Sequence, residues 1–425
     1  MFDQNSTRKS AVIAAPLLAG ALAVLPAAPA SAGDVAHPRV VSADPVDTTP
    51  HVLDGIVNAF ALVGDTVVVG GDFSRVREAR GSATLPRDGV FAFDLRTGRV
   101  DRRFAPRLEG AVSALAAGPD GRSVYVGGSF VSPRAGHGLA RLRLADGSPD
   151  PGFSAPVRGG DVSSLVLHAG RLYVGGDFTA IGRTPRQALA RLDPATGAVD
   201  PAFTVTPDGG RGGALKVYAM AASRDRLAVD GSFTTLGGRR RPQLGLVDIG
   251  AARPAVTDWH TEAYAADCKE VFPSYVRGLD FSPDGQYFVV VTTGGAKGTR
   301  KLCDSAARFE TYSHGDAIRP TWVNYTGGDS LYSVAVTGAA VYVGGHQRWL
   351  DNPRGSDSAG RGAVSRPGIG AIHPATGRAL SWNPTRDRGI GVKAFLAHKD
   401  GLLVGSDTTH LGHEYHARVG MFPLP

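Results

Sequence analysis

The sequence predicts an all-β fold, a single seven-bladed β-propeller, from its composition and from one recurring motif. Its 425 residues include 57 Gly and 28 Pro at 42% hydrophobic content, which supplies a large core but too many turn formers for a helical protein. The motif is an apolar triplet, usually followed by two glycines and often Phe, with clear copies at residues 67–73, 124–130, 172–178 and 227–233. Weaker copies at 288–295, 341–345 and 402–406 bring the number to seven. Their spacing of about 50 to 60 residues is typical of propeller blades.

The apolar triplets predict strands that are buried on both faces, because a sheet with one wet face would show polar alternation. A blade between two neighbouring blades has both faces covered in this way. We expect the glycines to mark places where a side chain does not fit or where φ is positive. No Lys-Ser/Thr pair follows them, so the motif is not a phosphate-binding loop.

The first residues predict a secretory signal peptide at 1–32. Arg8 and Lys9 precede an apolar run at 11–25, and Ala30, Ser31 and Ala32 form a small-residue signal with cleavage near Ala32. Beyond this region no run of 18 or more apolar residues occurs, so no transmembrane segment is expected in the mature chain. We therefore expect a secreted, extracellular protein with a short N-terminal linker at 33–38 and the propeller at 39–425.

The third unit shows how one blade is expected to be built. Strands are predicted at 162–167, 171–178, 188–192 and 199–204, and the turn at 193–197 has Asp and Gly where turn chemistry favours them. Four antiparallel strands make one blade.

The seventh unit has three predicted strands, at 391–397, 402–405 and 418–422, and the chain ends before a fourth. Residues 39–50, just upstream of the first blade, occupy the place that a fourth strand has in the other units. We therefore predict that the N-terminal segment completes the last blade, which closes the ring and removes exposed sheet edges.

The two cysteines, Cys268 and Cys303, flank the strands of the fifth unit and are predicted to form a disulfide in an oxidising compartment. His410, His413 and His416 are spaced by three, which suits neither strand alternation nor a helical zinc motif. We expect no metal site and no cofactor.

The loops between second and third strands are predicted to share one face, and six of them carry net charges between +1 and +3. Such a basic face attracts anions. The alternative is that these loops only reflect an arginine-rich composition and are simply solvated.

The longest of these loops and the blade link after it hold the candidate ligand-binding residues. A Trp beside Arg, His and Asn suits stacking on a sugar or base with hydrogen bonds to its rim. Alternatively, the loop closes the propeller mouth, with Arg stacked on Trp349. The candidates are His346, Gln347, Arg348, Trp349, Asn352, Arg354, Arg366, Trp382, Asn383, Arg386 and Arg388. No catalytic set can be assigned from spacing.

The motifs at 173–178, 192–197 and 200–203 resemble the delta-60 type, kelch-like repeats of secreted bacterial β-propeller proteins. Residues 345–349, 382–384 and 405–408 resemble the closing region of a secreted actinobacterial group of this type. The resemblance implies the propeller fold and supplies no catalytic residue.

The sequence thus favours a secreted, monomeric, non-catalytic binding module. Its expected partner is an anionic polysaccharide, a cell-wall polymer or an extracellular protein, and nucleic acid is not expected. The alternative is a secreted propeller enzyme, glycan-active or quinone-dependent, with its site at the central channel.

Overall fold

The structure is a computed structural model that describes residues 35–425, apart from 214, 269–273 and 297. The signal peptide predicted at 1–32 lies outside the described residues. Regular structure in the described chain consists of β-strands and two single-turn 3-10 helices, η2 (Arg211–Gly213) and η3 (Gly298–Arg300). The expectation of an all-β fold is confirmed. No helix among the described residues has the length and apolar character needed to cross a bilayer.

Seven principal antiparallel sheets follow one another along the described chain, and we number them sheets 1 to 7. In chain order they are β2 (Ile56–Val63), β3 (Thr66–Asp72) and β6 (Val90–Asp94); β7 (Val112–Ala117), β8 (Ser123–Ser132) and β9 (Gly136–Arg143); β11 (Val162–His168), β12 (Arg171–Gly176) and β15 (Leu189–Leu192); β17 (Val217–Ser223), β18 (Arg226–Gly231), β21 (Leu244–Asp248) and β22 (Ala255–Val256); β23 (Val276–Phe281), β24 (Tyr287–Thr292), β25 (Ser305–Glu310) and β26 (Trp322–Tyr325); β27 (Leu331–Val336), β28 (Val341–Gly345) and β31 (Ile369–Ile372); and β32 (Ala394–His398), β33 (Gly401–Gly405) and β36 (Val419–Pro423).

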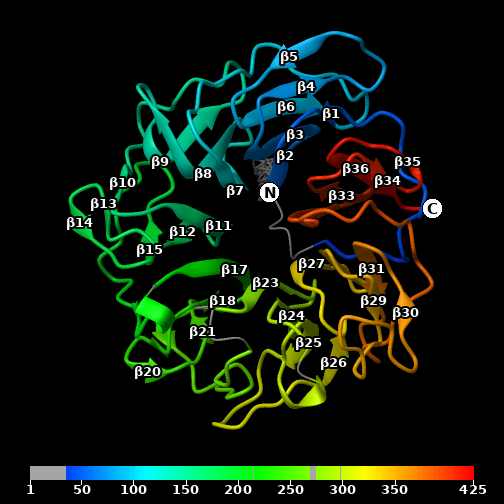
Figure 1. Cartoon of the computed structure of the whole chain (residues 1–425). Coiled ribbons are helices and arrows are strands. Elements are labelled where there is room, and N and C mark those ends of the chain that lie inside the picture. Colours follow the sequence, from blue (N-terminus) through cyan, green and yellow to red (C-terminus); the bar gives the residue numbers. More distant parts are fainter. Residues whose placement is uncertain (1–34, 214, 269–273, 297) are drawn as a thin grey trace, which may run out of the picture.

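The sheets lie around a central space, with β2, β7, β11, β17, β23 and β27 nearest to it (Figure 1). In five of the seven motifs the first glycine lets neighbouring sheets approach closely, since a Cβ on Gly70 would lie 2.5 Å from Val112 Cγ1 and one on Gly127, Gly175, Gly344 or Gly405 would meet the next sheet in the same way. Sheet 7 meets sheet 1 through the same contact, with a Cβ on Gly405 falling 2.6 Å from Val57 Cγ1. The glycines are therefore required where one sheet packs on the next.

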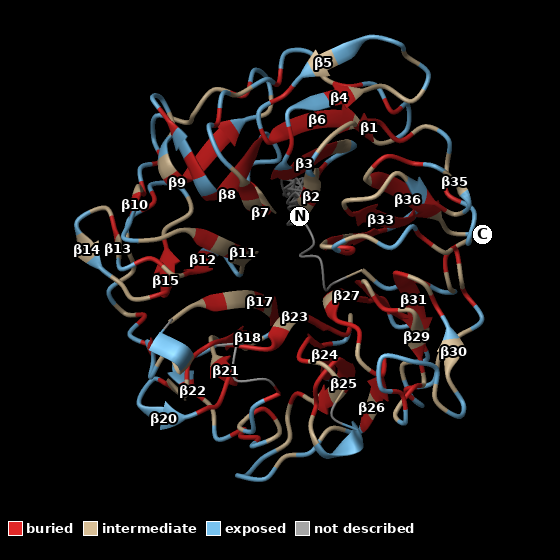
Figure 2. Ribbon diagram, viewed as in Figure 1, coloured by how far each residue is buried: buried red, intermediate tan, exposed pale blue. Residues whose placement is uncertain are grey.

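Five smaller sheets are formed by the connections between second and third strands, in some cases with a short strand from the preceding link. They are β1 (His51–Val52), β4 (Arg75–Arg77) and β5 (Thr84–Pro86); β10 (Val157–Arg158), β13 (Ala180–Ile181) and β14 (Thr184–Pro185); β16 (Pro207–Asp208), β19 (Thr235–Leu236) and β20 (Arg239–Arg240); β29 (Trp349–Leu350) and β30 (Val364–Ser365); and β34 (His410–Leu411) and β35 (Glu414–Tyr415). Figure 2 shows β5, β14, β20 and β30 at the outer rim, outside the buried strands of the principal sheets. Five of the predicted loops thus contain hairpins, whereas the connection in sheet 2 extends β8 and β9 and the one in sheet 5 contains η3.

The fourth strand predicted for every blade is present as a strand only in sheets 4 and 5, as β22 and β26. In sheet 3 it is reduced to one bridge, Leu192 with Val199. The ladder ends there because Pro201 has no N–H to donate and the chain turns, so that the buried Phe203 packs against Tyr173. Single bridges also replace the strand in three other sheets, at Phe93–Val100, Leu142–Pro149 and Ile372–Ala379.

The N-terminal segment runs beside the last strand of sheet 7. Ser42 N donates to Pro423 O at 2.8 Å and Val46 N to Met421 O at 2.9 Å, although no strand is formed there. His37, placed in the predicted linker, is buried and lies with Nε2 2.9 Å from His398 O. A hydrophobic cluster joins Val57 and Phe60 of sheet 1 to Leu403 of sheet 7.

The predicted disulfide between Cys268 and Cys303 is confirmed, with Cα atoms 5.8 Å apart. It lies against Gly294, just after β24: a Cβ on Gly294 would fall 2.4 Å from Cys268 Cβ. Both cysteines are buried within the aromatic core of sheet 5.

Candidate functional site

The predicted loop is folded onto its own blade. The guanidinium of Arg348 stacks on Trp349 at 4.3 Å, which is one part of the alternative interpretation. The buried carboxylate of Asp329 accepts hydrogen bonds from Arg348 Nε at 2.8 Å and from a terminal nitrogen of Arg388 at 2.9 Å. Asp329 therefore holds the loop and the following link together, and sequence spacing gave no sign of it.

Three further predicted residues have internal partners. Asn352 donates to Thr326 O and to Ser358 O, Arg366 donates to Leu380 O, and Arg386 donates to Asp407 Oδ1, Thr408 Oγ1 and Gly345 O. Burial lowers the pKa of Arg366 and Arg386 from the ordinary value. These contacts fix the backbone at the edge of sheets 6 and 7.

The remaining predicted residues do not converge on one place. Trp382 is buried, donates through Nε1 to Ser42 O at 2.9 Å, and packs edge-on against Tyr342 and Phe422. Arg354 is exposed and Asn383 half-buried. Gln347 is fully buried, while His346 faces the inner strand of its own sheet through Tyr332.

A different set of residues lies together at the start of the inner strands. We call the first strand of each principal sheet its inner strand. In sheets 1 to 6 the pairing of this strand with the second strand shifts by one residue near its start. In sheet 7 the pairing begins at Ala394, just after the equivalent residue. The residue at this point is set apart from the ladder and is directed toward the next sheet: Asn58 donates to Val112 O, and Ser163 to Val217 O. We call this set the bulge ring, comprising Asn58, Ser113, Ser163, Tyr218, Arg277, Tyr332 and Lys393.

One half of the bulge ring alternates aromatic and cationic side chains. The Arg277 guanidinium lies 5.1 Å from the Tyr218 ring, and Lys393 Nζ lies 3.5 Å from the Tyr332 ring. The Tyr332 hydroxyl is 3.3 Å from His346 Nδ1. We call Tyr218, Arg277, Tyr332 and Lys393 the cationic arc. Sheets 1 to 3 contribute only small neutral residues at the same positions.

The two cations of the arc repel each other. Burial and, to a smaller extent, the nearby charge of Arg277 lower the pKa of Lys393 to about 8, against the attraction of Asp407. Burial also lowers the pKa of Arg277, against the attraction of the Asp230 carboxylate, and burial raises the pKa of Asp230 to about 7. No carboxylate of the described residues forms an ion pair with Lys393. An anion placed across the arc would relieve this repulsion.

The sequence does contain a signal for the ring. Each inner strand begins with an apolar residue, a variable residue and then a small one, as in Val57-Asn58-Ala59 and Val392-Lys393-Ala394. The variable residue changes from Asn and Ser in the first three units to Tyr, Arg, Tyr and Lys in the last four. Comparing that one position across the repeats would have found the cationic arc.

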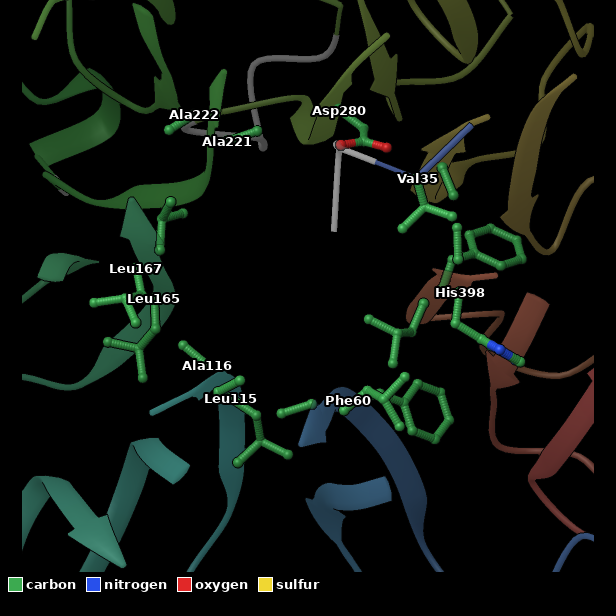
Figure 3. Close-up of a pocket in the computed structure, with 18 of the residues that line it drawn as sticks. Val35, Phe60, Leu115, Ala116, Leu165, Leu167, Ala221, Ala222, Asp280 and His398 are labelled. Carbon is green, nitrogen blue, oxygen red and sulfur yellow. The ribbon is translucent and has the colours of Figure 1, made fainter. Parts of the chain in front are cut away.

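A cavity of about 510 Å³ lies on the central axis and is lined by all seven inner strands (Figure 3). Its lining is mostly aliphatic, including Leu115, Leu165 and Leu167. Asp280, His398 and Lys399 are the titratable residues of the lining. Asp280 accepts from Val336 N at 2.8 Å, and burial lowers the pKa of His398 to about 4. Because Gly64 and Lys399 also line it, the cavity lies toward the first-to-second turns, away from the bulge ring.

Comparison with known proteins gives one informative match. Residues 170–203, which contain β12 and β15, match the model of a family described as "Domain of unknown function (DUF5122) beta-propeller". No curated protein matches the chain. Among solved structures, the computationally designed protein Ika8 is similar over 90% of this chain and 100% of its own, at 13% identity and a TM-score of 0.49. The family match covers residues 170–203 and, together with the all-β sheets, supports a β-propeller fold.

Proposed function

We propose that this protein is a secreted, seven-bladed β-propeller, closed by its N-terminal segment, that binds an anionic polymer without catalysis. The seven inner strands around one cavity and the contact of sheet 7 with sheet 1 support the blade number and the closure. A buried disulfide supports export to an oxidising compartment.

The cationic arc is the main support for the proposed binding function. It presents two cations and two aromatic faces at one end of the axis, a combination that suits a carboxylate, sulfate or phosphate group attached to a sugar ring. The second-to-third hairpins emerge at that same end, because antiparallel strands place these connections beside the start of the inner strands.

Exposed arginines on these hairpins extend the positive surface outward. Arg80, Arg134 and Arg183 of these hairpins, and Arg158 of β10, which pairs with β13, are exposed and have no carboxylate within ion-pair distance among the described residues. We call these four the rim arginines. A flexible polyanion that is anchored at the arc can contact the rim, and such contacts weaken as salt screens them.

The test measures binding of heparin, polygalacturonate and a poly(glycerol phosphate) across a salt series, with neutral dextran as the control ligand. Replacing the four rim arginines by Gln is expected to weaken binding about tenfold. The matched control replaces Arg99, Arg122, Arg253 and Arg319, which are equally exposed but lie in first-to-second or third-to-fourth turns on the opposite face.

Equal losses in the two quadruple variants would show that only net charge matters and would remove the assignment to this face.

Tyr332→Leu is expected to weaken binding of all three polymers with little change in the salt dependence. Release of reducing ends from polygalacturonate during the same assays would instead favour the glycan-active enzyme.

A further inference from the structure

Asp47, Glu414 and His416 bring three potential metal ligands together at the junction of the N-terminal segment and sheet 7. One oxygen of each carboxylate and one imidazole nitrogen all lie within 4.8 Å of one another. Glu414 and His416 are two residues apart at the end of the β34–β35 hairpin, so their side chains share a face. Asp47 is held opposite them because its neighbour Val46 donates to Met421 O.

The hydrogen bonds of His416 determine which nitrogen faces the carboxylates. Thr49 Oγ1 donates its one hydrogen to Val419 O at 3.2 Å, so it accepts from His416 Nδ1, which is also 3.2 Å away. The proton of a neutral imidazole is then on Nδ1, and the lone pair of Nε2 is directed at Glu414.

This arrangement leaves Nε2 without a suitable partner. The His416 ring is 4% exposed, and Nε2 lies 3.5 Å from Glu414 Oε2 with no hydrogen bond to any described residue. A neutral nitrogen lone pair facing two carboxylates is repulsive unless a cation lies between them.

We propose that His416 Nε2, Glu414 and Asp47 bind one divalent transition-metal ion, with Zn²⁺ as the reference, that fastens the N-terminal segment to sheet 7. A nitrogen and two carboxylate oxygens suit Zn²⁺ or Mn²⁺ better than Ca²⁺ or Mg²⁺, which prefer oxygen alone. The bond from His416 to Thr49 is the outer hydrogen bond that orients ligating histidines in metal sites.

The ligands need only small movements. Two ligand atoms on one tetrahedral ion lie about 3.4 Å apart, so the carboxylates must close by about 1 Å. Both belong to partly exposed side chains that can rotate, while the ring of His416 stays fixed. The spacing of His410, His413 and His416 gave no sign of this site because two of its ligands come from outside that triplet: His410 instead pairs with Asp387 at 2.8 Å.

The test uses the untagged mature protein after chelator treatment. Titration with Zn²⁺ is expected to show one saturable equivalent and to raise the melting temperature by on the order of a few degrees, with Ca²⁺ and Mg²⁺ giving less. Native-state hydrogen exchange at the Val46 amide, which bonds to Met421 O, is expected to slow only in the loaded protein.

Asp47→Asn and Glu414→Gln are expected to lose the Zn²⁺ equivalent and the exchange protection while keeping the melting temperature of the metal-free protein. The control is Asp387→Asn, which removes an equally exposed carboxylate beside His410 and is expected to bind Zn²⁺ as the wild type does. Absence of saturable binding, or wild-type binding by Asp47→Asn, would overturn the proposal.

Discussion

Sheets 1 to 4 and sheets 5 to 7 have different kinds of residue at one position of the repeat, just after the second strand. The pairing registers align all seven sheets at one position, which in sheets 1, 2, 3 and 6 is the second residue after the paired glycines. In the first group that residue is a buried aromatic, Phe73, Phe130, Phe178 or Phe233, and in the second it is Gly294, Gln347 or Thr408.

Each departure in the second group is accommodated differently. The disulfide lies against Gly294, the Arg386 guanidinium binds Thr408, and Gln347 is buried as a polar residue. Most of the cationic arc lies in these same three sheets. At this position, therefore, the first four sheets use an aromatic core residue, whereas the last three use a disulfide contact, a buried amide or a hydrogen bond to Arg386.

Phe178→Ala is expected to produce the largest loss of stability. Phe178 is fully buried among Val157, Val162 and Ile181, so its removal costs the transfer free energy and leaves a cavity, about 3–5 kcal/mol together. Chemical denaturation of the purified variant, with and without reductant, measures the loss. It is expected to be independent of redox state, and a loss below 1 kcal/mol would show that this ring is not a core element.

The double variant Cys268→Ala/Cys303→Ala tests the disulfide of sheet 5, which lies where the first four sheets have a buried Phe. The bond spans 35 residues of sequence, for which chain entropy gives a stabilisation of about 4 kcal/mol. Wild-type protein is expected to lose this amount in reductant, whereas the double variant is expected to be unaffected by reductant. Equal sensitivity of both proteins would assign the effect of reductant to something other than this bond.

The sequence predicted the repeat, the strand of each motif and the disulfide because these features depend on local patterns. The strand predicted at 171–178 appears as β12 at Arg171–Gly176, and the pair of cysteines needed only an oxidising compartment. The cationic arc was missed because the register shift removes its residues from the alternation that reveals a strand face. Asp329 was missed because its partners, Arg348 and Arg388, lie 19 and 59 residues away.

Gln347→Met is expected to stabilise the protein by about 1–2 kcal/mol. Neither amide atom of this buried side chain has a hydrogen-bond partner among the described residues, so the polar group carries an uncompensated desolvation cost. The matched control is Gln243→Met, because Gln243 is equally buried but donates to Tyr264 O and accepts from Tyr275 N. It is expected to destabilise, and a loss of stability in both variants would contradict the inference for Gln347.

The smallest expected effect is the pH dependence of stability that Lys393 contributes, because sheets 1 to 3 have no titratable residue at the same position of the repeat. Burial and Arg277 lower the pKa of Lys393 from 10.5 to about 8, so between these values the unfolded chain holds a proton that the folded protein releases. Folding therefore becomes more favourable as pH rises through this window, and below pH 8 the contribution is constant. Relative to Lys393→Met, the wild type is expected to gain about 1 kcal/mol across the window in paired denaturation curves. A bound polyanion is expected to keep Lys393 protonated and to abolish this gain, whereas the same polyanion is expected to have no such effect on Lys393→Met. A pH-independent difference between the two proteins would mean that Lys393 is solvated like an ordinary lysine and that the arc exerts no strain on it.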